Sequence, residues 1–167
     1  MIGLVRDILK YSKKHSGETK TPKTMSLDLG VPKRRILEAL CVLRGSSIYD
    51  SHTNVLNMSL TIHVRFHGII PRLTVMTSAV CSILNTHDIN TEFVVDDFSW
   101  LKVKKNDERV LYDALNGLTG AKILRQWKGR GKSHRYILLK KPKIIHIEHC
   151  MPSCSINLRR SSRIKTT

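Results

Sequence analysis

The stretch RRILEALCVLRG, residues 34–45, has a second version in RVLYDALNGLTG, residues 109–120. A shift of 75 positions aligns the two, and the same ungapped shift aligns residues 1–9 with 76–84. Ten of the 48 aligned columns are identical, whereas average composition predicts about three. The sequence therefore predicts an internal duplication. The identical pairs are Met1/Met76, Val5/Val80, Ile8/Ile83, Leu9/Leu84, Arg34/Arg109, Ala39/Ala114, Leu40/Leu115, Leu43/Leu118, Gly45/Gly120 and Ile48/Ile123.

The length of 167 residues suits two small domains of this kind. We expect a first domain over residues 1–60, a linker over 61–71, a second domain over 72–141 and a flexible basic tail over 142–167. Hydrophobic residues make up 41% of the chain, enough for two thin cores. The apolar runs are too short for a membrane span, and charges within the N-terminal pattern argue against a signal peptide. We expect a soluble protein that is not secreted and has no membrane partner.

Basic residues dominate the charge, with 29 Lys and Arg against 13 Asp and Glu, a net charge of +16. They are unevenly distributed: residues 101–141 hold 12 basic and 3 acidic side chains, whereas 61–100 hold 2 and 4. A concentrated basic excess is typical of proteins that bind polyanions, and nucleic acid is the first candidate. A merely solubilising basic surface is the alternative.

In the first repeat, the apolar spacing predicts a helix from Ile2 that ends near Gly17. A second helix begins at the Thr21-Pro22 cap and closes at Gly30. A third begins at Pro32, and we expect Gly45 to end it in a left-handed conformation. Residues 46–60 read as strand, polar turn and strand, and the alternation over 62–66 predicts a further extended segment.

The second repeat follows the same plan. We expect a first helix over residues 73–84, a second in TEFVVDDF with Thr91 as its cap, and a third from an Asn106 cap through Leu118. Strands are predicted over 123–127 and 136–139, with a Gly/Lys/Arg turn between them. The predicted fold class is thus α+β, with two tandem winged helix-turn-helix domains of three helices and a β-hairpin wing each.

The candidate DNA-binding residues lie at three places. The inward stripe of the first repeat's third helix leaves basic residues outward at its N-terminal end, where a recognition helix meets the major groove. Arginine there can donate two hydrogen bonds to guanine. The corresponding helix of the second repeat and its hairpin carry further candidates, suited to base or phosphate contact. The residues are Lys33, Arg34 and Arg35; Lys104, Lys105, Arg109, Tyr112 and Asn116; and Lys128, Arg130, Lys132 and Arg135.

Simpler readings exist for these sites: a solvated helix face with an Arg34–Glu38 pair, and a hairpin that is only polar. The tail carries metal-capable side chains, but their spacing does not match that of structural zinc sites. We expect a tail without metal, with a zinc site as the alternative, and no cofactor. These tail residues are His146, His149, Cys150 and Cys154.

Cys41 and Cys81 fall within helical patterns and are expected to be buried thiols in a reducing compartment. We find no catalytic motif. Asp96 and Asp97 are adjacent and point to different sides of a helix, and there is no phosphate-binding loop or activated nucleophile. The sequence predicts neither enzymatic activity nor a small-molecule substrate.

The stretches KRRILEALCVLRG and RVLYDALNGLTGAKIL resemble the E-two-F/DP family of winged-helix cell-cycle transcription factors, whose recognition helix carries an R-R-x-Y-D signature. The first copy keeps the arginine pair as Arg34 and Arg35. The second keeps Tyr112 and Asp113 but only Arg109 of the pair. The resemblance covers both repeats.

In that family two such domains pair on DNA and the signature arginines read guanines; atypical members carry both domains in one chain. The resemblance thus implies a nuclear, sequence-specific regulator of transcription that binds double-stranded DNA as an intramolecular pseudo-dimer, with a DP-like or other protein as a further partner. The alternative is a tandem winged-helix general transcription or polymerase accessory factor, which works through protein contacts and nonspecific DNA binding. A third hypothesis is a nucleic-acid enzyme.

Overall fold

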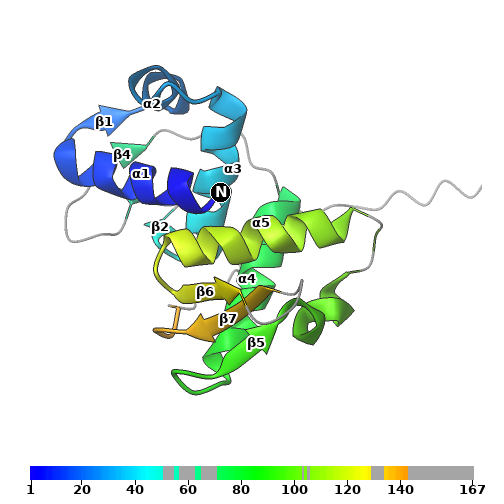
Figure 1. The fold of residues 1–167 in the computed structure, drawn as a ribbon. Helices are drawn as coiled ribbons and strands as arrows, with labels where there is room; N and C mark the ends of the chain where they lie inside the picture. Colours follow the sequence, from blue (N-terminus) through cyan, green and yellow to red (C-terminus); the bar gives the residue numbers. More distant parts are fainter. Residues whose placement is uncertain are drawn as a thin grey trace, which may run out of the picture.

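The chain forms helices and short strands in the computed structural model, which describes residues 1–50, 55–56, 63–64, 71–102, 104, 106–128 and 134–142 (Figure 1). The predicted α+β class is confirmed at this level. In these ranges, no helix is both long and apolar enough to cross a membrane.

The first repeat contains three helices, and the chain continues into short strands that form one sheet. Thr21 caps the second helix, since its hydroxyl accepts a hydrogen bond of 3.1 Å from the Thr24 N–H, and Gly30 closes it with φ 62°. Both features confirm the prediction. The elements are α1 (Ile2–Lys14), β1 (Thr19–Lys20), α2 (Pro22–Leu29), α3 (Lys33–Gly45), β2 (Tyr49–Asp50), β3 (Val55–Leu56) and β4 (His63–Val64).

The sheet of this first part has the order β1-β4-β3-β2. Strand β4 pairs antiparallel with β3, which confirms the extended segment predicted around Val64. Strand β1 pairs in parallel with β4 and was not predicted. With two residues, β1 is too short to produce an alternation of apolar and polar side chains.

The second repeat has the element order helix, strand, helix, helix, strand, strand. Its sheet has the order β5-β7-β6, and both pairings are antiparallel. The elements are α4 (Pro71–Asn85), β5 (Glu92–Val94), the 3₁₀-helix η1 (Val95–Leu101), α5 (Asp107–Gly120), β6 (Leu124–Lys128) and β7 (His134–Leu138).

The prediction of a helix in TEFVVDDF, residues 91–98, is wrong for the first half of this segment. Residues 92–94 form strand β5, because an aromatic and a β-branched residue there pair with β7, with Phe93 opposite Tyr136. Thr91 is not a cap; its hydroxyl donates to the carbonyl of Asp88. The helical segment η1 starts only at Val95, where the Asp97 carboxylate accepts a hydrogen bond of 2.8 Å from the Val94 N–H.

The expected left-handed stop at Gly45 is also wrong, because the left-handed residue lies two positions later. Ser47 has φ 58°, and its counterpart 75 positions on, Lys122, has φ 57°. After each, an isoleucine N–H returns to the helix: Ile48 to the carbonyl of Leu43 at 2.9 Å, and Ile123 to that of Leu118 at 3.0 Å. The two helix ends therefore have the same Schellman-type hydrogen bonding.

The glycines at these helix ends serve close packing instead. A Cβ added at Gly45 would lie 2.6 Å from the Thr74 carbonyl oxygen and 2.7 Å from Thr77 Cβ, both on α4. A Cβ at Gly120 would lie 2.6 Å from the carbonyl oxygen of Ile2 on α1. Because Ile2 and Thr77 are also 75 positions apart, each repeat's glycine meets the first helix of the other repeat at an equivalent residue.

Helices α3 and α5 meet at one further pair, Val42 and Gly117, and both residues are buried. A Cβ added at Gly117 would come within 2.9 Å of Val42 Cγ2, closer than real Cβ atoms approach such a neighbour. Gly117 is the residue of the second repeat that corresponds to Val42 in the first. Two equivalent positions thus contact each other, as they do at the two-fold axis of a dimer of identical subunits. The buried core is continuous across both repeats.

We predict that Gly117→Ala destabilises the protein by about 1–3 kcal/mol, because the added methyl group overpacks this contact. The matched control is Gly3→Ala on α1, where no atom lies within 4 Å of the added Cβ. It removes the same helix penalty of glycine and should stabilise by about 0.5–1 kcal/mol. Chemical denaturation of both variants measures the difference.

Val42→Ala combined with Gly117→Ala should cost less than the sum of the single substitutions, because the smaller side chain makes room for the new methyl group. Strict additivity would contradict a direct contact between the two positions.

Candidate nucleic-acid interface

The first candidate region is the start of α3. A turn of three residues, 30–32, separates α2 from α3, and its first residue Gly30 is left-handed. The apolar face of α3 is fully buried, including Ile36 and Leu40. This orientation leaves Lys33 and Arg34 exposed at the first turn, as predicted.

Glu38 joins the two arginines of this turn. Its side chain is only 10% exposed, and its two carboxylate oxygens contact Arg34 Nε at 3.3 Å and Arg35 Nη1 at 2.5 Å. The Arg34 side chain nevertheless remains 82% exposed, and that of Arg35 38%. The simpler reading, an Arg34–Glu38 pair, is therefore present together with the exposed basic end. The carboxylate restrains both guanidinium groups and leaves Arg34 open to a partner.

The second candidate region is the start of α5, which carries less positive charge. Lys104 and Arg109 are exposed, but Glu108 occupies the position equivalent to Lys33. Asp107 is buried at the helix start, where its carboxylate pairs with Arg72 of α4 and accepts a hydrogen bond of 2.6 Å from the Lys104 N–H. Asn106 lies at the N-cap position but makes no side-chain cap bond.

The remaining candidates on α5 are only partly accessible. Tyr112 is half-buried and packs against the core, and Asn116 is half-buried as well. Only part of each of these two side chains is therefore accessible to a binding partner.

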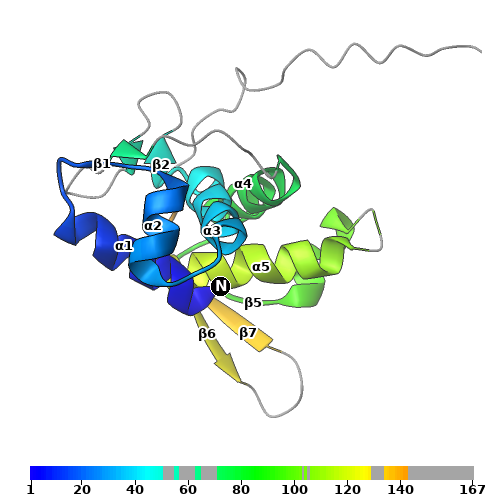
Figure 2. The ribbon, with the colours of Figure 1, turned by 90° about the horizontal axis from the view of Figure 1, so that it is seen from above.

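The third candidate region is the hairpin of β6 and β7, which projects away from the helices (Figure 2). Arg135 is exposed, and its guanidinium carbon lies 5.6 Å from the centre of the Trp127 ring. Arg135 also pairs with Glu92 of β5 at 3.4 Å. Lys128 ends β6, and nothing further of its side chain is described. Lys105, Arg130 and Lys132 lie outside the described residues.

The candidate regions on α3 and α5 lie in different parts of the fold. Helix α3 begins beside α2, whereas the C-terminal Gly120 of α5 contacts α1 (Figure 1). With 14 residues, α5 is about 21 Å long, so its first turn lies well away from that contact.

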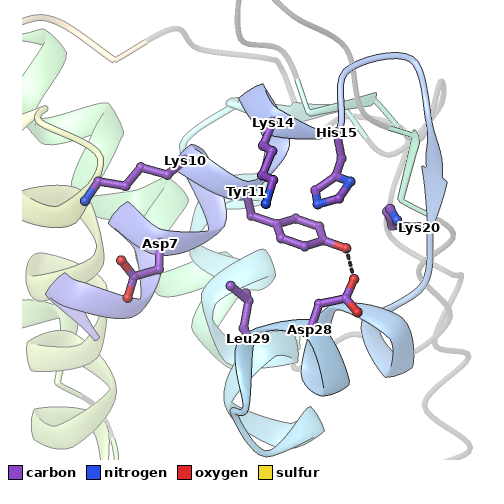
Figure 3. Close-up of a pocket in the computed structure, with 8 residues that line it drawn as sticks. All are labelled: Asp7, Lys10, Tyr11, Lys14, His15, Lys20, Asp28 and Leu29. Atoms are coloured by element: carbon purple, nitrogen blue, oxygen red, sulfur yellow. Dashed lines mark hydrogen bonds between the residues drawn. The ribbon is translucent and has the colours of Figure 1, made fainter.

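A pocket lies between α1, β1 and α2 (Figure 3). Tyr11 donates a hydrogen bond of 2.5 Å to Asp28 Oδ2, and Lys20 pairs with Glu18 at 2.7 Å. Burial, followed by the neighbouring Asp28, raises the pKa of Tyr11 to about 12. Three lysines and two aspartates line the pocket, so its charge is mixed. Its lining residues are Asp7, Lys10, Tyr11, Lys14, His15, Lys20, Asp28 and Leu29.

In the described part of the chain, no group of three or more His, Cys, Asp or Glu side chains could hold a metal ion. The tail residues His146, His149, Cys150 and Cys154 lie outside it. Cys41 and Cys81 are buried thiols, as predicted, and burial raises the pKa of Cys81 to about 12.

Two residues of the interface were not among the sequence-based candidates. Glu38 was considered only as a partner of Arg34, and Trp127 was not considered. The alternation in β6 carries the signal for Trp127: Leu124 faces the core, so Arg125 and Trp127 face away from it.

Comparisons with protein-family models, with curated proteins and with solved structures found no match to this chain.

We predict that Tyr11 and Tyr136 ionise near pH 12. Burial, and then the neighbouring Tyr112, raise the pKa of Tyr136 to about 12, as burial and Asp28 do for Tyr11. A raised pKa of an acid means that the fold favours the neutral form. The stabilisation from these tyrosines is thus complete below the unfolded pKa of about 10 and is lost as the pH rises towards 12.

Absorbance at 295 nm measures this titration, and denaturation between pH 9 and 12 measures the loss of stability. Tyr11→Phe should remove one of the late-ionising groups. Ionisation of all four tyrosines near pH 10 in the folded protein would contradict the burial of these two hydroxyls.

Proposed function

We propose that the chain is a nuclear, sequence-specific regulator of transcription that binds double-stranded DNA and has no enzymatic activity. The observation that carries the proposal is the arginine pair at the first turn of α3, restrained by the nearly buried carboxylate of Glu38. A restrained guanidinium loses less freedom when it meets a base edge. Arg34 and Arg35 are the residues that would read guanines in the major groove.

The local architecture supports this role for α3. Two helices joined by a turn of three residues with a glycine are typical of the helix-turn-helix, whose second helix enters the major groove. The strands that follow each third helix fit the wing of a winged helix. We therefore propose two winged helix-turn-helix domains of the E-two-F/DP type in one chain.

The two repeats would contribute unequally to DNA recognition. Arg109 is the one counterpart of the arginine pair in the second repeat, and the first turn of α5 also carries Asp107 and Glu108. Acidic groups there oppose the approach of phosphates. We infer that α3 supplies most of the base recognition, and that α5 and the basic hairpin position the DNA through its backbone.

We further propose that the two repeats act as an intramolecular pseudo-dimer. The reciprocal contacts of Gly45 with α4 and of Gly120 with α1 support this arrangement, as does the contact of Val42 with its own equivalent Gly117. Pairing within one chain means that a single molecule carries both recognition helices.

The acidic start of α5 also favours a second candidate function. In a general transcription or polymerase accessory factor, the second repeat would bind a protein and the first would touch DNA without reading it. The ratio of specific to nonspecific affinity separates the two functions, since nonspecific binding depends almost wholly on the counterions that DNA releases when the protein binds, and it therefore weakens steeply with added salt.

We predict that selection from a random duplex pool yields a defined site, and that Arg34→Ala or Arg35→Ala weakens binding to that site by about 1–3 kcal/mol while relaxing one base position. Arg109→Ala is the matched control at the equivalent position and should change base preference less. Gel shifts or fluorescence anisotropy on the selected and a scrambled duplex measure both effects. Equal weakening on the two duplexes would show that the arginines contact only the backbone.

We also predict that the full chain binds its site as one molecule per duplex, which analytical ultracentrifugation can measure. Residues 1–70 and 71–142 as separate chains should bind at least about 100-fold more weakly, because linkage no longer holds the second repeat close to the DNA. Two chains per duplex, or a single repeat with the affinity of the full chain, would argue against an intramolecular pair.

A further inference from the structure

The exposed face of the sheet in the second repeat carries a tryptophan that the proposed duplex contacts do not use. Trp127 on β6 remains 40% exposed, and it lies directly opposite Arg135 on β7. Along β7 alternate residues turn inward, since Tyr136 and Leu138 are fully buried, and on β6 Leu124 is buried as well. The sheet therefore has a core face and an outer face, and Trp127 and Arg135 share the outer one.

Arg135 is held in place on this face from two sides. Its guanidinium lies over the Trp127 ring at 5.6 Å, within the range of a cation–π interaction. On the other side it pairs with Glu92 of the adjacent strand β5 at 3.4 Å. The indole thus carries an ordered cation next to it while much of its own surface stays open.

The charge around this tryptophan selects a polyanionic partner. Residues 122–141, which span both strands of the hairpin, contain eight Lys and Arg and no Asp or Glu. Arg125, the other outward residue of β6, is exposed. An apolar ring among cations fits a ligand that is both flat and negatively charged, and a nucleotide has this combination in its base and phosphate.

We propose that Trp127, together with Arg135, is a stacking site for an unpaired base of DNA. In a duplex the faces of the bases are covered by their neighbours, and separating them costs a few kcal/mol per step. A single strand exposes these faces at no such cost, and every base can stack on an aromatic ring. Trp127 therefore favours single-stranded or locally opened DNA, in addition to the contacts with the duplex backbone proposed for the basic residues of the hairpin.

This inference rests on the proposed DNA binding but concerns a side chain, Trp127, and a form of DNA that the proposed duplex contacts do not involve. It places the opened or single-stranded segment beside the duplex site, at the hairpin of the second repeat. The arginines of α3 and the tryptophan of β6 can therefore be tested separately in the full chain.

The experiment uses the intrinsic fluorescence of the full chain, which has two tryptophans, Trp100 and Trp127. Trp100→Phe leaves Trp127 as the reporter, and Trp127→Phe leaves Trp100, which is 68% exposed and serves as the control. Both variants are titrated with a 16-nucleotide oligo-dT, with a blunt duplex of the same length and with heparin, a polyanion without bases.

We expect oligo-dT to quench Trp127 strongly, heparin to leave it nearly unchanged, and Trp100 to respond to neither. Trp127→Ala should weaken oligo-dT binding by about 5- to 150-fold, the effect of losing one stacked base, whereas Trp127→Phe should keep most of the affinity. Arg125→Ala is the charge control and should weaken binding to oligo-dT and heparin alike.

Equal quenching by heparin and oligo-dT would overturn the stacking site, and so would equal losses for Trp127→Ala on both ligands. Stronger binding of an acidic polypeptide, such as polyglutamate, than of oligo-dT would instead indicate an acidic protein as the partner of this face. Discrimination between the selected and scrambled duplexes by the Trp127→Ala variant tests the proposed duplex function independently. If the Trp127→Ala variant still discriminates between the two duplexes while oligo-dT fails to quench Trp127, the stacking site is rejected and the proposed duplex function is not.

Discussion

The contact between Val42 and Gly117 is the constraint on which the arrangement of the two repeats depends. Two helices can approach closely only where a small residue makes room, and here the side chain of one repeat fills the space that the other leaves empty. The glycines at the ends of α3 and α5 extend the same close approach to the first helix of the opposite repeat. Because the core is continuous across this seam, neither repeat completes its apolar packing alone.

The direction of the candidate recognition surfaces follows from this seam. The C-terminal halves of α3 and α5 are mostly buried, so the fully exposed side chains of both helices lie at their N-terminal turns. Basic residues at these turns are thus held by helices that cannot tilt without disturbing the core. The packing of the helices holds the backbone of the first turn of α3, and the Glu38 carboxylate contacts the guanidinium groups of both Arg34 and Arg35.

Much of this fold could be predicted from the sequence. Helical periodicity located α1, α3, α4 and α5, and the Thr21-Pro22 cap located α2. The strand at Phe93 could not be distinguished from a helix, because a run of three residues has no clear period and its partner β7 lies more than 40 positions away. At the end of α3, glycine was the obvious candidate for a left-handed residue, yet Ser47 adopts that conformation and Gly45 is used for packing.

In the candidate site, too, features set by nearby residues could be predicted, whereas features set by residues far away in the sequence could not. Exposure of Lys33 and Arg34 follows from the position of the apolar stripe, which is local in the sequence. Arg135 was expected to be a phosphate contact, but its cross-strand partner Trp127 and its contact with Glu92 depend on strand register. The duplication was evident from the shift of 75 positions. The reciprocal contacts between the two repeats could not be predicted from it, because two similar domains can fold in one chain without packing against each other.

The difference between valine and glycine at positions 42 and 117 also has an evolutionary consequence. As long as both copies of a duplicated segment are alike, either can be overwritten by the other without loss. Here, overwriting one copy would place valine against valine or glycine against glycine, which leaves either a collision or a void at the seam. Recombination between the two halves is therefore penalised, and the two copies can diverge in sequence while they remain packed against each other.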